Sequence, residues 1–219
     1  ELLIKYLKKD HKIDEVIQIL KNDIKNHIRK DMAYNKLLDI YDEYGKLEEK
    51  KKLLPEVIIE TNSFARYKEL KDMYSDSEWD PIKAKIISKI KPNNRNILED
   101  IYMEENETDK LFELLKQNPS MYKLAKYQDA TKNKYSQELL NFYKPQILEE
   151  SKRASNRKWY QELCYYIRKM KELNNSDDFI FDMLKEMYPN YKNKRAFKEE
   201  IMNVLSSKNK QRFYELINS

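Results

Sequence analysis

The stretch YGKLEEKKKLL, Tyr44 to Leu54, contains the only glycine among the 219 residues of this chain. Glycine reaches positive φ angles without steric cost, so tight hairpins, β-bulges and phosphate-binding loops depend on it. A chain that uses glycine once cannot contain many such elements. Gly45 is therefore expected to mark a turn that requires left-handed backbone, and the same turn should recur elsewhere in the chain.

The surroundings of Gly45 recur twice. In the segment from Leu7 to Leu20, His11 occupies the place of Gly45, at an offset of 34 residues. This offset is the period of tetratricopeptide helix-turn-helix repeats. A looser copy from Tyr102 to Leu115 has Asn106 in the glycine slot. Since Asn and His tolerate left-handed backbone well, His11, Gly45 and Asn106 are predicted to be turn residues between antiparallel helices.

The composition is typical of a folded protein. Hydrophobic residues make up 40% of the chain, and 17 Tyr and 7 Phe supply area to bury although 37% of the residues are charged. No apolar run approaches the ~20 residues of a membrane span, so no membrane partner is expected. One cysteine excludes an internal disulfide and fits a cytoplasmic location. Because the chain starts at Glu1 rather than Met, we expect it to be the C-terminal part of a longer protein.

Apolar residues recur at three- and four-residue steps almost throughout, and no stretch alternates strictly over the length of a strand. The connections between these periodic segments are short, so sequential helices should pack as antiparallel neighbours. We expect an all-α fold, an α-α superhelix of tetratricopeptide-like hairpins that forms a single domain over residues 1–219. The predicted helices lie near 1–9, 13–27, 31–43, 47–60, 62–73, 77–89, 94–105, 108–117, 120–130, 134–150, 156–173, 176–187, 193–206 and 208–217.

Few residues offer catalytic or metal-binding chemistry. With one glycine, the chain cannot form a phosphate loop, a dinucleotide-binding fingerprint, a nucleophile elbow or an EF-hand. His11 and His27 are the only histidines and Cys164 is the only cysteine, so no zinc site is expected. Cys164 lies in an aromatic segment with neither histidine near it in sequence, and is predicted to be a buried core residue. We therefore expect no metal, no cofactor and no enzymatic activity in this chain.

The one strongly basic segment runs from Lys152 to Glu172, with seven cations against two anions. At 100° per residue, Arg157, Arg168 and Lys171 project to one side, where they could contact phosphate or an acidic partner. The simpler alternative is a solvated helix face. The opposite side is an apolar stripe of five residues: Trp159, Leu163, Tyr166, Met170 and Leu173. Of these, Trp159 is predicted to lie in the core with Leu163 and Met170 beside it.

Several motifs from Trp79 onward carry a family resemblance. They are SEWD, IISKI, ILEDIYMEEN, ASNRKWY, YIRKMK and MYPNY, in this order along the chain. Together they resemble the helical, tetratricopeptide-like C-terminal region of bacterial and archaeal SWIM zinc-finger proteins. The resemblance implies a helical region of a larger cytoplasmic protein. The zinc ligands of that family follow a Cys-x-Cys…Cys-x-His pattern upstream of its helices, and this chain has no such pattern. The resemblance therefore assigns neither zinc binding nor the family's proposed DNA binding to any residue of this chain.

Two functions from different classes fit these observations. The first is a non-enzymatic helical-repeat scaffold that binds another protein, because stacked hairpins offer a long surface for recognition. The second is an accessory nucleic-acid-binding surface on the basic helix at 152–171. An enzyme ranks third, because no acid, base, nucleophile or metal constellation is present in the sequence. The sequence identifies no particular protein partner.

Overall fold

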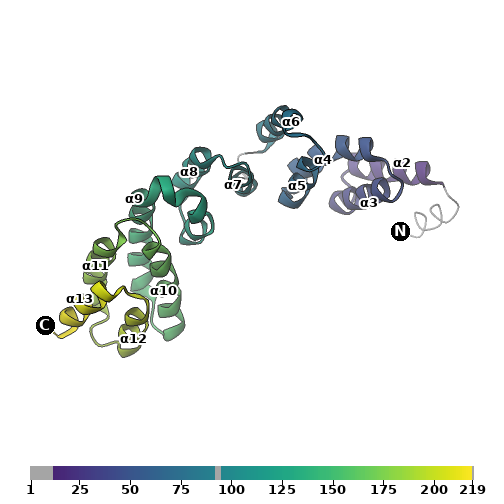
Figure 1. Ribbon diagram of the computed structural model, residues 1–219. Helices are drawn as coiled ribbons and strands as arrows, with labels where there is room; N and C mark the ends of the chain where they lie inside the picture. Colours follow the sequence, from purple (N-terminus) through teal and green to yellow (C-terminus); the bar gives the residue numbers. More distant parts are fainter. Residues whose placement is uncertain (1–11, 92–94, 219) are drawn as a thin grey trace. The chain divides into compact units, whose positions relative to one another are not determined.

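The computed structural model describes residues 12–91 and 95–218, and His11 lies outside these described residues. All their regular elements are helical, with no strand among them, so the described part of the chain is all-α (Figure 1). The elements are α2 (Ile13–Lys25), α3 (Lys30–Glu43), α4 (Leu47–Thr61), α5 (Phe64–Lys71), α6 (Asp76–Lys89), α7 (Arg95–Glu104), α8 (Thr108–Gln117), α9 (Met121–Arg153), α10 (Arg157–Lys171), α11 (Ser176–Met187), the 3-10 turn η2 (Tyr188–Asn190), α12 (Arg195–Val204) and α13 (Ser207–Asn218).

The helix α9 joins two segments that the sequence predicts as separate helices, 120–130 and 134–150. Tyr135 has non-helical backbone angles, φ −126° and ψ 29°, so the element bends there. Thr131 Oγ1 donates to the carbonyl of Tyr127 at 3.0 Å, and Ser136 Oγ donates to that of Lys132 at 2.6 Å. Hydroxyl groups that bond the preceding turn often bend a helix, which accounts for a kink in place of the predicted break.

Three turns that end helices share one geometry. Gly45 follows α3 with φ +62°, and the next N–H, of Lys46, donates to the carbonyl of Tyr41 at 2.8 Å. An equivalent bond of 2.8 Å closes the turn at Asn106, φ +55°, after α7. Gly45 and Asn106 therefore have the left-handed conformation expected from the sequence. His27, φ +56°, makes the same turn after α2, where the N–H of Ile28 donates to the carbonyl of Asp23 at 2.8 Å. The sequence repeat did not predict this turn.

The chain divides into two compact units, which we call the N-terminal unit, residues 1–101, and the C-terminal unit, residues 102–219. The boundary falls within α7. A single domain over 1–219 stays a prediction.

The N-terminal unit is built by α2 packing on α3, α3 on α4, and α4 on both α5 and α6. Its first core cluster joins α2 to α3 through apolar residues at helical spacing: Ile13, Val16, Ile17 and Leu20 against Ala33, Leu37, Ile40 and Tyr41. Lys50 of α4 is buried among these helices, with 6% of its surface exposed. Its ammonium group pairs with the carboxylates of Asp42 and Glu69, which offsets the cost of burying a charge.

In the C-terminal unit, helices pack in two ways, on the next helix along the chain and on the next but one. The first kind of contact joins α8 to α9, α9 to α10 and α10 to α11, and the second joins α9 to α11, α10 to α12 and α11 to α13 (Figure 1). Tyr160, Leu163, Cys164, Ile167 and Met170 form the buried stripe of α10 at the centre of the main core cluster.

The prediction that Trp159 lies in the core is wrong, because 42% of its surface is exposed. The buried stripe of α10 starts one residue later, at Tyr160, which is 2% exposed. The ring of Tyr160 makes edge-to-face contacts with Tyr191 and Phe197, at centroid distances of 5.7 and 5.6 Å. Such aromatic pairs stabilise a core beyond the area they bury, so they select Tyr160 over its neighbour.

Candidate functional site

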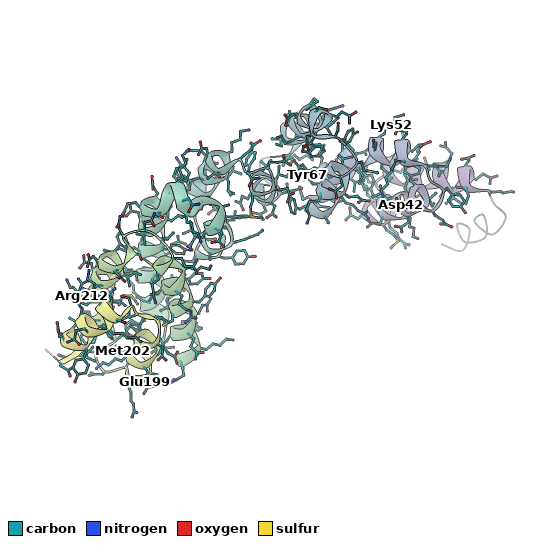
Figure 2. All side chains as sticks on the ribbon, in the orientation of Figure 1. Asp42, Lys52, Tyr67, Glu199, Met202 and Arg212 are labelled. Carbon is teal, nitrogen blue, oxygen red and sulfur yellow. The ribbon has the colours of Figure 1, made fainter. Side chains whose placement is uncertain are left out.

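The predicted basic surface of α10 is largely neutralised within the protein. Arg157 Nη1 lies 2.9 Å from Glu200 Oε1, and its Nη2 pairs with Glu199, which is labelled in Figure 2. The hydrogen bond with Glu199 raises the pKa of Arg157, and the same bond lowers the pKa of Glu199. The guanidinium group of Arg157 therefore ties α10 to α12 and already has two carboxylate partners.

The other two predicted residues do not join Arg157 in a common patch. Lys171 Nζ donates to the carbonyl of Val204, near the end of α12, at 2.6 Å. Arg168 is exposed and forms no ion pair with any described residue. Arg157 and Lys171 stand fourteen residues apart in one helix, about 21 Å at the usual rise. Of the three predicted contacts, only Arg168 remains free to bind a phosphate.

The side of α10 that carries Trp159 borders a small cavity of about 220 Å³. Trp159 and Tyr166 lie on one face of the helix, seven residues apart, with Glu162 between them. The cavity is lined by Met121, Glu150, Ala154, Trp159, Glu162, Leu163 and Tyr166. It is smaller than the usual pocket for a drug-sized ligand, so it suits at most one side chain of a partner.

A larger hollow of about 600 Å³ lies between α4 and α6 in the N-terminal unit. We call it the α4–α6 groove. Its floor is apolar, and lysines and glutamates form its rim. It is lined by Lys51, Lys52, Pro55, Glu56, Ile59, Glu60, Tyr74, Ile82, Lys85, Ile86 and Lys89. Ile59, Ile82 and Tyr74 are only half buried, so the floor keeps apolar surface in contact with solvent.

Both glutamates of the α4–α6 groove are held by the neighbouring helix α3. The hydroxyl of Tyr34 donates to Glu56 Oε1 at 2.6 Å, and Lys30 Nζ lies 2.9 Å from Glu60 Oε2. The hydrogen bond from Lys30 lowers the pKa of Glu60. The lysines of the rim have no such partners on α3, so the charge that the groove offers to a ligand is positive.

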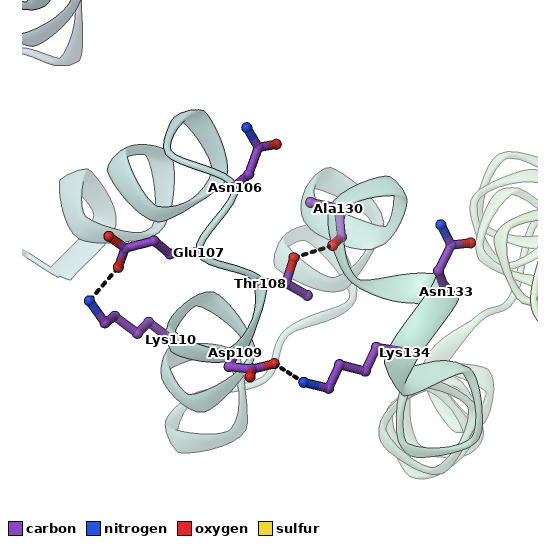
Figure 3. A pocket seen from close by; sticks show the side chains of 8 residues that line it. All are labelled: Asn106, Glu107, Thr108, Asp109, Lys110, Ala130, Asn133 and Lys134. Atoms are coloured by element: carbon purple, nitrogen blue, oxygen red, sulfur yellow. Dashed lines mark hydrogen bonds and ion pairs between the residues drawn. The ribbon is translucent and has the colours of Figure 1, made fainter. Parts of the chain in front are cut away.

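A third hollow, in the C-terminal unit, surrounds the turn at Asn106 (Figure 3). Its charged groups pair with one another, as Figure 3 shows for Asp109 with Lys134 and for Glu107 with Lys110. Asp109 also accepts a hydrogen bond of 2.7 Å from the hydroxyl of Tyr135. The hydrogen bond from Lys134 lowers the pKa of Asp109, ahead of the one from Tyr135. The contacts of Asp109 with Lys134 and Tyr135 fasten α8 to the bend in α9, which is a structural role.

The described residues contain no group of three or more His, Cys, Asp or Glu side chains placed to hold a metal ion. Cys164 is buried in the core as predicted, and burial raises the pKa of its thiol to about 12, which keeps it protonated. In the part of the chain that the structure describes, no helix combines the length and the apolar character that a membrane span requires.

No family model, no curated protein sequence and no solved structure matches this chain.

Proposed function

We propose that this chain is a non-enzymatic helical scaffold that binds another protein. The observation that carries the proposal is the α4–α6 groove, whose floor leaves Ile59, Ile82 and Tyr74 partly exposed. Each Å² of apolar surface left in water forgoes roughly 25 cal/mol of burial energy. A contiguous apolar hollow with a polar rim is therefore typical of a surface that another protein covers.

The contacts between helices support an α-α superhelix as the architecture of this scaffold. In such a fold helices pack on their neighbours along the chain and on the next but one, and three contacts of each kind occur in the C-terminal unit. With the motif resemblance, we propose that the chain is the helical region of a cytoplasmic SWIM zinc-finger-like protein. Sequence upstream of Glu1 that contains Cys-x-Cys and Cys-x-His pairs would support this assignment, and a different upstream domain would refute it.

Nucleic-acid binding through α10 is the less favoured function. Arg157 and Lys171 already have partners within the C-terminal unit, so a phosphate would have to displace them. A duplex-binding surface typically needs several unpaired cations side by side.

The scaffold proposal can be tested by selecting peptides from a displayed library on the purified chain. The matched variants are Ile82→Asp, which places a charge in the groove floor, and Ala84→Asp. Ala84 lies on the same helix, two residues on, and is exposed outside the groove. Peptides that bind the natural chain and the Ala84 variant but not the Ile82 variant would support the proposal. A library that yields no binder, or binders that ignore both substitutions, would refute it.

A further inference from the structure

We infer that the α4–α6 groove binds an acidic amphipathic helix of a partner protein. This inference rests on the proposed function and adds the chemistry of the partner. Each wall of the groove is one helix, with residues at four-residue spacing along it. On α4 the floor residues are Pro55 and Ile59, and on α6 they are Ile82 and Ile86.

The floor residues form two apolar ridges, one on each helix, because residues four apart lie on one face of a helix. The lining of α4 runs over nine helical steps, from Lys51 to Glu60, which is about 14 Å at the usual rise. A groove of this length matches two to three turns of a docked helix. A helix that presents apolar side chains at positions i, i+3, i+4 and i+7 would cover such a floor.

The charge of the rim indicates that the partner is acidic. Lys52, Lys85 and Lys89 are exposed and form no ion pair with any described residue (Lys52 is labelled in Figure 2). The two carboxylates of the rim are engaged by Tyr34 and Lys30 of α3. Lys30 neutralises Glu60, whereas Glu56 keeps its negative charge, since the Tyr34 hydroxyl is neutral. An acidic segment would therefore meet three unpaired ammonium groups against one carboxylate charge.

The fourth lysine of the rim is held in place by the groove itself. Lys51 Nζ lies 4.7 Å from the centroid of the Tyr74 ring, within the range of a cation–π contact. This contact keeps a positive charge at one end of the groove. It also covers one face of the only aromatic side chain in the lining.

The floor favours a peptide over a nucleic acid. Single-stranded nucleic acids bind grooves in which several aromatic rings stack with bases. This groove offers one ring, which Lys51 covers, and otherwise Pro and Ile side chains. Aliphatic floors with a rim of charges are the pattern of helix-in-groove recognition between proteins.

The character of the partner can be tested by fluorescence anisotropy with three dye-labelled probe peptides. Each has about fourteen residues, a length that spans the groove with one helical turn to spare. The acidic probe has Leu at i, i+3, i+4 and i+7 and Glu on its flanks. The basic probe has Lys in place of Glu, and the polar probe has Gln in place of Leu. We expect the acidic probe alone to bind, and its affinity to fall as salt is raised, since rim charges are screened.

The test variant converts Lys52, Lys85 and Lys89 to Gln, and it should weaken binding of the acidic probe by roughly tenfold. The matched control converts three exposed lysines of the C-terminal unit to Gln and so removes the same charge: Lys158, Lys192 and Lys210. The control should bind the acidic probe as the natural chain does. Circular dichroism of both variants checks that the helices are intact.

Several results would overturn the inference. One is an acidic probe that fails to bind, or that binds the test variant and the natural chain alike. If the basic probe binds instead, and Ile82→Asp abolishes that binding, the scaffold function stands and only the acidic character of the partner is wrong. If a single-stranded oligonucleotide binds and the triple Gln variant abolishes it while every peptide fails, the groove is a nucleic-acid site, and both proposals fail.

Discussion

Substitutions at Gly45 test whether this one glycine is kept for its backbone conformation. Gly45 has φ +62°, in the left-handed region, and a Cβ atom added there would meet nothing within 4 Å. A side chain at this position therefore has space, and its cost comes from the backbone alone. The same turn occurs at Asn106, so an Asn at position 45 should be tolerated best.

The expected losses in unfolding free energy follow from this geometry. Left-handed backbone costs a non-glycine residue roughly 1–2 kcal/mol, and part of this is offset because the substitution also restricts the unfolded chain. We expect Gly45→Asn to cost under about 0.5 kcal/mol and Gly45→Ala about 1 kcal/mol. Gly45→Val should cost about 2 kcal/mol, since a β-branched residue is least compatible with this region.

The assay is urea unfolding followed by the fluorescence of Trp79. Trp79 is 4% exposed on α6, so it reports on the N-terminal unit, which also contains Gly45. All variants should carry Trp159→Phe, which removes the signal of the C-terminal unit at an exposed position. The midpoint should fall in the order Asn, Ala, Val with an unchanged slope.

Two results would refute the reasoning. A Val variant with the midpoint of the natural chain would show that the turn does not need left-handed backbone. An Ala variant less stable than the Val variant would show that the loss comes from something other than Ramachandran strain.

Three further outcomes are expected. Iodide should quench the fluorescence of Trp159 but not that of the buried Trp79, and a Trp159 indole that iodide does not reach would contradict its exposed position. Trp159→Ala should lower the unfolding free energy by roughly 2 kcal/mol, below the 3–5 kcal/mol typical of a fully buried aromatic side chain. Cys164 should react with a thiol reagent only as fast as the protein opens, because the thiol is buried where the reagent cannot reach it, and burial also raises its pKa to about 12. Rapid labelling of the native protein would argue against its place in the core. The natural chain should have a negligible affinity for duplex DNA at physiological salt, and converting Arg157, Arg168 and Lys171 to Gln should not change it. If the natural chain instead binds with sub-micromolar affinity, and the three substitutions flatten the log–log salt slope by about 0.9 per lost phosphate contact, the ranking of the two functions is reversed.

Local sequence determined the helices and the character of their turns. Apolar residues at three- and four-residue steps, as in Ile13, Val16 and Leu20, form a continuous face only on an α-helix, so the period identifies the element without any distant contact. The preference of Gly45 and Asn106 for positive φ likewise belongs to the residue itself. These features were predictable because their physical causes lie within a few residues of each other. The burial of Lys50 was not, since its partners include Glu69 of another helix.

Tertiary structure alone decided which groups stay exposed and which charges stay free. Trp159 and Tyr160 are adjacent apolar residues one helical step apart, and only the rings of Tyr191 and Phe197, far along the chain, select Tyr160 for the core. Arg157 is a free cation in the sequence and a paired one in the fold, because α12 brings two carboxylates to it. The α4–α6 groove exists only because α4 and α6 pack together with α5 between them in the chain. The period of a helix specifies the width of its apolar face but not the segment that covers it, so the core, the ion pairs and the groove had to come from the packing.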